Sequence, residues 1–122
     1  LALLSTTTVS LQTPAATTLF TVPTGKRCVL TSLNIRCGSL TSPTAKFTAG
    51  QVGALTDFLA EVTCTNLVAT YDTLICVPIP AATALKGKSY AAGTVLQINV
   101  TTADVDGSTD AIVDLFGYLY SV

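Results

Sequence analysis

The longest alternation of apolar and polar positions in the chain runs from Arg27 to Cys37. One set of alternate positions holds Val29, Thr31, Leu33, Ile35 and Cys37, and the other holds Cys28, Leu30, Ser32, Asn34 and Arg36. Successive side chains of a β-strand point to opposite faces of its sheet, so this period of two predicts an extended strand. A short β run over residues 19–22 precedes it, and Pro23 and Gly25 supply a turn between the two.

Later segments repeat this strand pattern at residues 45–50, 70–79, 94–102 and 110–120, with Pro or Gly between them. The inward positions of the three strongest strands predict a core made of Leu33, Ile35, Leu96, Ile98, Val113 and Leu115. In segment 70–79 both faces are largely apolar. We therefore expect one of its faces to be buried in the sandwich and the other to lie against a partner.

Segment 54–62 has a different spacing. Leu55, Phe58, Leu59 and Val62 stand at i, i+3, i+4 and i+7, which is the spacing of one helical face. This predicts one or two helical turns, or an irregular excursion between two sheets.

Seven or eight short strands without a long amphipathic helix predict an all-β chain. The expected architecture is a single antiparallel β-sandwich, jelly-roll-like, over residues 19–122. Residues 1–18 are rich in Thr, Ser and Ala and are interpreted as an extended N-terminal arm that a neighbour stabilises. An ordinary first strand of the sheet is the alternative for this segment.

Charged residues make up 11% of the chain, against about 25% in an average soluble domain. Either the domain has a neutral, Thr-rich surface, or part of its surface is covered by other protein. The net charge of −1 and the scattered basic residues provide no clustered positive face for nucleic acid. The apolar runs are too short to cross a bilayer, so neither nucleic acid nor a membrane is an expected partner.

The four cysteines are Cys28, Cys37, Cys64 and Cys76. They form no C-x-x-C pair and the chain has no His, so a zinc site is not expected. Cys28 and Cys37 occupy opposite sets of the alternation, which predicts that they face opposite sides of the sheet. Free, buried thiols are the prediction, and disulfides are the alternative.

The absence of His also removes triads of the Ser-His-Asp kind, and we expect neither an enzyme nor a cofactor. The segment around Asp104, Asp106 and Asp110, with Gly107, offers oxygen ligands and a turn suited to calcium. It lacks the complete spacing of a calcium-binding loop. An Asp-Gly hairpin loop explains it equally well, so it is only a weak metal candidate.

Two groups of apolar residues are candidates for partner contacts. Residues 1–18 carry apolar side chains without a pattern that would bury them within one domain, and Phe116 to Tyr120 place aromatic rings on one face of the last strand. A carbohydrate platform is one interpretation of those rings, but Trp is absent, and packing or a subunit interface is favoured. The predicted partner-binding residues are Leu1, Leu3, Leu4, Val9, Leu11, Tyr118 and Tyr120.

The turn-and-strand sequences of this chain resemble those of small bacteriophage virion proteins, namely capsid decoration (cement) proteins and related head-fibre or tail β-sandwich domains. The resemblance rests on four stretches from residue 19 onward: Phe20-Thr-Val-Pro-Thr-Gly-Lys-Arg27 with the strand to Arg36, Leu85 to Gly93, Val95-Leu-Gln-Ile98, and Phe116-Gly-Tyr-Leu-Tyr120. These motifs describe turns and strands and include no catalytic residues.

The resemblance implies a structural subunit that decorates a bacteriophage head and bridges its major capsid proteins. It further implies a homo-oligomer, with a trimer favoured, that is assembled in the host cytoplasm and located on the capsid surface of the virion. The alternative is a receptor- or glycan-binding domain of a phage head or tail fibre. The absence of Trp and the scarcity of charge favour decoration, because glycan sites need a stacking platform with a polar cluster.

Overall fold

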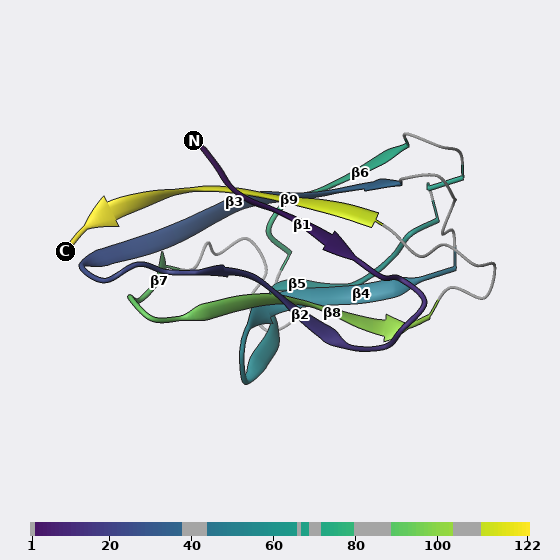
Figure 1. Ribbon diagram of the computed structural model, residues 1–122, viewed down its shortest axis with the longest axis horizontal. Helices are drawn as coiled ribbons and strands as arrows, with labels where there is room; N and C mark the ends of the chain where they lie inside the picture. The colour runs from purple at the N-terminus through teal and green to yellow at the C-terminus, as the bar shows by residue number, and fades with distance from the viewer. Residues whose placement is uncertain (1, 38–43, 66, 69–71, 80–88, 104–110) are drawn as a thin grey trace.

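The computed structural model describes residues 2–37, 44–65, 67–68, 72–79, 89–103 and 111–122 (Figure 1). Within these residues the chain forms strands and turns and no helix. The strands are β1 (Ala2–Val9), β2 (Ala16–Thr21), β3 (Lys26–Cys37), β4 (Lys46–Gln51), β5 (Ala54–Thr63), β6 (Thr73–Cys76), β7 (Ser89–Tyr90), β8 (Val95–Thr102) and β9 (Ala111–Ser121).

Two antiparallel sheets pack face to face, so the predicted β-sandwich is confirmed (Figure 1). The five-stranded sheet has the order β1-β9-β3-β6, with the short β7 also paired to β3, and the four-stranded sheet has the order β2-β8-β4-β5. Consecutive strands lie in opposite sheets except for β4 and β5, which form a hairpin, and β6 and β7, which both pair with β3.

The core lies between the sheets and contains all six side chains that the alternation placed there. Leu33, Ile35, Leu96, Ile98, Val113 and Leu115 are each at most 1% exposed. The largest fully buried side chain is Phe47 of β4.

The alternation in β3 is interrupted near its middle. Leu30 lies opposite Gly117 of β9 and Ser32 lies opposite Phe116, so Thr31 is an extra residue on β3, a β-bulge. The bulge moves the inward face from one set of positions to the other, and Cys28 and Leu30 are buried along with Leu33 and Ile35. The prediction that Cys28 and Cys37 face opposite sides of the sheet assumed an uninterrupted alternation, and the bulge removes that assumption. The Cys37 side chain itself lies outside the described residues.

The helical interpretation of residues 54–62 is wrong, because this segment is strand β5, paired with β4. Its register shifts where Ala49 faces Leu59, and the adjacent Phe58 and Leu59 are both buried. Irregular pairing of this kind places two neighbouring side chains on the core side. The result is a spacing of buried residues that imitates one face of a helix.

Residues 2–9 are integrated into the five-stranded sheet as β1, which pairs with β9 from Ala2 to Val9. Val9 and Leu11 are buried in the core of their own domain. The proposed boundary between residues 18 and 19 falls inside β2. In the structure this segment thus corresponds to the alternative, an ordinary first strand, and not to an extended arm.

A buried polar contact connects the two sheets at β7. The Tyr90 hydroxyl donates to Asp57 Oδ1 of β5 at 2.8 Å, and Gln51 Nε2 donates to Asp57 Oδ2 at 2.7 Å. Burial, together with the Asp57 carboxylate, raises the pKa of Tyr90. The neutral phenol is therefore kept as a donor, which ties β7 and the five-stranded sheet to β5.

Cys28 and Cys76 are buried free thiols, as predicted, and Cys64 is also buried. Burial raises the pKa of Cys28 and of Cys76 from 9.0 to about 11, because desolvation disfavours the thiolate. The folded state consequently holds these two protons more tightly than the unfolded chain does.

We expect the free energy of unfolding to be insensitive to these two thiols below pH 9 and to fall as the pH rises from 9 towards 11. Urea unfolding of the wild type and of a Cys28→Ala/Cys76→Ala variant across this range measures the effect. The free energy of unfolding of the variant should fall less over this pH range than that of the wild type. An equally steep decline in both proteins would contradict the assignment to the thiols.

Candidate interaction surface

The outer face of the five-stranded sheet, which points away from the four-stranded sheet, carries large apolar side chains. On the edge strand β6 and just beyond it, Ile75 is 67% and Val77 is 56% exposed, whereas Cys76 between them is buried. On the opposite edge, Leu3 of β1 is 54% exposed and lies opposite Phe116 of β9. Both edges of this face therefore expose large apolar side chains.

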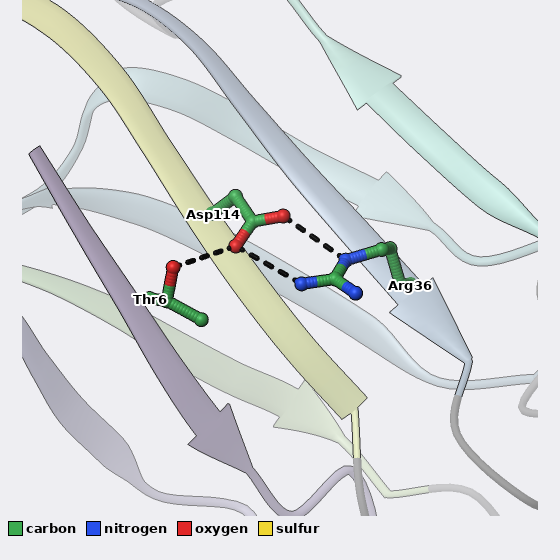
Figure 2. Close-up of polar contacts among 3 residues, drawn as sticks. All are labelled: Thr6, Arg36 and Asp114. Carbon is green, nitrogen blue, oxygen red and sulfur yellow. Dashed lines mark hydrogen bonds and ion pairs between the residues drawn. The ribbon is translucent and has the colours of Figure 1, made fainter. Parts of the chain in front are cut away.

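A polar contact interrupts the apolar face near its centre (Figure 2). Arg36 of β3 donates to Asp114 of β9 through Nε at 3.0 Å and through Nη2 at 3.3 Å, and the Thr6 hydroxyl of β1 donates to Asp114 Oδ1 at 2.9 Å. The three side chains come from three adjacent strands. Asp114 is thus satisfied within the chain, and this contact cross-links the sheet.

A second polar group lies at the end of the sandwich where the β2–β3 turn, β7 and the C-terminal end of β9 meet (Figure 1). Arg27 donates from Nε to Ser89 Oγ and from Nη2 to the Ser89 carbonyl oxygen, both at 2.8 Å. Ser89 Oγ also shares a hydrogen bond of 2.6 Å with the Tyr120 hydroxyl. The Tyr120 ring lies 6.4 Å from the Tyr118 ring, centroid to centroid.

On the other face of the same end of the sheet, Lys26 Nζ donates to Ser121 Oγ at 2.9 Å. We call the group formed by Arg27, Ser89, Tyr118 and Tyr120 the basic–aromatic cluster. Tyr118 and Tyr120 are 45% and 40% exposed, so the aromatic part of the cluster is open to a partner.

The structure divides the predicted partner-binding residues. Leu3, Tyr118 and Tyr120 are exposed, Leu4 packs against the core, and Leu1 lies outside the described residues. The prediction is wrong for Val9 and Leu11, because their side chains are only 2% and 0% exposed and cannot reach a partner in this fold. Sequence reasoning missed them because it treated residues 1–18 as separate from the core.

The weak calcium candidate Asp104, Asp106 and Asp110 lies outside the described residues. Within the described part of the chain, no group of three or more acidic or cysteine side chains has a geometry that would hold a metal ion. None of the described segments is a helix long and apolar enough to span a membrane.

The sequence did not predict that the residues of the basic–aromatic cluster lie together, nor that Arg36 pairs with Asp114. Arg27 and Ser89 are separated by 62 positions in the sequence, and Arg36 and Asp114 by 78. Only the strand register brings them together. The weak signal in the sequence was that Lys26 and Arg27 are adjacent and follow a turn.

Comparison with known proteins gives a likeness of fold. No protein-family model matches the chain, and no curated protein sequence matches it. The structure is similar to a chain of the cyanophage Pam1 capsid asymmetric unit, with a TM-score of 0.52 and 13% sequence identity. The match covers 97% of this chain and 81% of that one, so the similarity concerns the complete sandwich.

Proposed function

We propose that this chain is a structural protein of a bacteriophage virion and that it decorates the capsid surface. The observation that carries the proposal is the likeness of the whole sandwich to a chain of a phage capsid asymmetric unit. The turn-and-strand resemblance to decoration proteins supports the same function independently of the structure.

The outer face of the five-stranded sheet supports a role in an assembly. Leu3, Ile75 and Val77 are each more than half exposed, and burying such side chains against a partner is favourable by about 1.5–3 kcal/mol for each one fully buried. The low content of charged residues, 11%, fits a chain whose surface is partly covered. The partners that we propose are the major capsid protein and further copies of this chain, in a trimer.

The test is binding to empty heads of the phage whose genome encodes the chain. We expect the purified protein to sediment with the heads and to saturate at hundreds of copies per head, because a decoration subunit repeats with the capsid lattice. Quantitative gel densitometry against the major capsid protein measures the copy number.

The same count distinguishes the alternative role. Saturation at a few copies or a dozen copies per head would indicate a fibre domain, for which the exposed Tyr118 and Tyr120 would be the binding platform. Absence of binding would reject decoration. Deleting residues 1–18 is not a suitable test, because the deletion removes β1 and the core residues Val9 and Leu11.

A further inference from the structure

We infer that three exposed side chains, Ile75, Val77 and Ile79, form a self-complementary surface through which two copies of this chain pair about a two-fold axis. We call these three side chains the Ile–Val–Ile row. The inference deepens the proposed function, which names further copies of this chain as partners. A two-fold contact joins two chains, so it is separate from the three-fold contacts of a trimer.

The row belongs to one extended segment that passes from one sheet to the other, on the side of the sandwich opposite to β1. The first part of the segment is β6, which pairs with β3 up to Cys76. Beyond it, the Ile79 N–H donates to the Phe58 carbonyl oxygen of β5 at 3.0 Å, and the Ile79 carbonyl oxygen accepts from the Ala60 N–H at 2.7 Å. Alternate side chains of an extended segment point to the same side. Cys76 is therefore buried, whereas all three side chains of the row are more than half exposed.

The backbone of this segment does not invite a partner strand. Both backbone hydrogen-bonding groups of Ile79 are already bonded to β5, and Pro78 has no N–H to donate. A proline at a sheet edge interrupts the ladder of hydrogen bonds that strand addition requires. Recognition must therefore use the side chains of the row, which are branched hydrocarbons without hydrogen-bond donors or acceptors.

The row has the same order of residue types in both directions, isoleucine, valine and isoleucine. When two such rows lie face to face and antiparallel, Val77 of one copy meets Val77 of the other, and each Ile75 meets an Ile79. Residues at a two-fold axis meet their own kind, so a surface that pairs in this way must be complementary to itself. The row meets this condition, because every contact across the axis joins two aliphatic side chains of similar size.

Charge also favours a second copy as the occupant. A charged side chain at a two-fold axis faces the same charge on the other copy, which is unfavourable. Residues 73–79 contain no charged side chain. Beside the start of this segment, Asp72 accepts a hydrogen bond from the Val68 N–H, and Arg36 on the neighbouring strand β3 is paired with Asp114. Two copies of the row can therefore approach each other without repulsion at the axis.

Other parts of the described surface lack this property. The outer face of the four-stranded sheet is polar, with Thr101 donating to Glu61 and Gln97 donating to Thr18. An isologous contact through the basic–aromatic cluster would bring the Arg27 guanidinium of one copy toward that of the other. Among these surfaces, the row is the one whose chemistry matches itself.

The contact is small, with three apolar side chains from each copy, so the pairing in solution is weak. We expect a dissociation constant on the order of 0.1–1 mM, because interfaces well below the standard size are transient. Copies held side by side on one capsid have effective concentrations of about millimolar, at which such a contact is populated.

The experiment is sedimentation equilibrium of the purified chain from about 10 µM to 2 mM, a range that spans the expected dissociation constant. Val77→Asp and Val77→Lys each place like charges at the axis and should weaken pairing about tenfold or more. An equimolar mixture of the two variants should pair again, because aspartate then faces lysine. Val52→Asp is the matched control, since Val52 is 58% and Val77 56% exposed, and Val52 lies in the turn between β4 and β5.

The control should pair like the wild type, and circular dichroism with thermal unfolding establishes that every variant is folded. Recovery of pairing in the mixture is the result that supports a two-fold axis at Val77. Loss of pairing in both variants without recovery in the mixture would show that the row binds a different surface, which overturns the inference.

Two further results would also overturn it. A wild type that stays monomeric at 2 mM has no such contact, and if Val77→Asp then loses binding to heads, the row binds a capsid subunit instead. Pairing that neither variant weakens lies elsewhere on the chain. Head binding tests the proposed function separately: pairing at Val77 without binding to heads would support this inference and reject decoration.

Discussion

Replacing Ile98 by alanine is expected to lower the free energy of unfolding by about 2–5 kcal/mol, the range found for large-to-small substitutions in cores. Ile98 is 0% exposed and lies on β8, in the middle of the four-stranded sheet. Its β4 partner, Ala49, is small and also buried, so it cannot fill the space that the isoleucine leaves. The loss therefore contains both the transfer free energy of the removed carbons and the cost of a cavity. Urea denaturation followed by far-ultraviolet circular dichroism measures it.

The matched control is Ile75→Ala, the same chemical change at a position that is 67% exposed. In the isolated protein it should cost less than about 1 kcal/mol, the span of strand propensity, because no cavity forms. If the two substitutions cost the same, the division between the core and the outer face is wrong. Ile75→Ala should show its larger effect only when a partner covers the outer face.

The second large effect is expected at Gly117, where substitution by alanine should cost about 3 kcal/mol, the upper part of the range for overpacking. A Cβ atom at this position would collide with the carbonyl oxygen of Val29 and approach the Leu30 Cα to 3.1 Å. Both are backbone atoms of β3 at the bulge, so no change of side-chain rotamer can relieve the contact. The absence of a side chain at Gly117 is thus what permits β3 to bulge toward β9.

Gly53→Ala separates this steric effect from backbone strain. Gly53 has a φ of 87°, and nothing lies within 4 Å of a Cβ built there. Its substitution should cost only about 1–2 kcal/mol, the penalty of the left-handed conformation for an L-residue. A Gly117→Ala variant that is as stable as the wild type would show that the bulge can shift without loss.

The division of the surface has a consequence for function. The outer face of the five-stranded sheet satisfies its central charge internally through Arg36 and Asp114, whereas the end of the sandwich leaves Arg27 and Lys26 without a carboxylate among the described residues. An apolar face with an internally paired charge suits broad contact in an assembly.

Much of the fold follows from local sequence pattern. Strict alternation identified β3, β8 and β9 and the six core residues on them, because a strand that is buried on one face must place apolar side chains two apart. The two apolar faces of segment 70–79 predicted one buried face and one face against a partner without assigning them, and the structure buries Cys76 and exposes Ile75 and Val77. These predictions needed only the periodicity of one strand at a time.

The features that depend on the pairing of two strands were decided only by the tertiary structure. The bulge at Thr31 exists because of how β3 pairs with β9, and irregular pairing with β4 gives β5 its helix-like spacing. The same is true of β1, whose residues Ala2 to Val9 have little pattern of their own and become a strand by pairing with β9. Register brings together Arg27 with Ser89 and Arg36 with Asp114, and register is a property of two strands. A single sequence records the periodicity of each strand but not the pairing between strands, and in this protein that pairing brings Arg27 to Ser89 and Arg36 to Asp114 on the candidate surface.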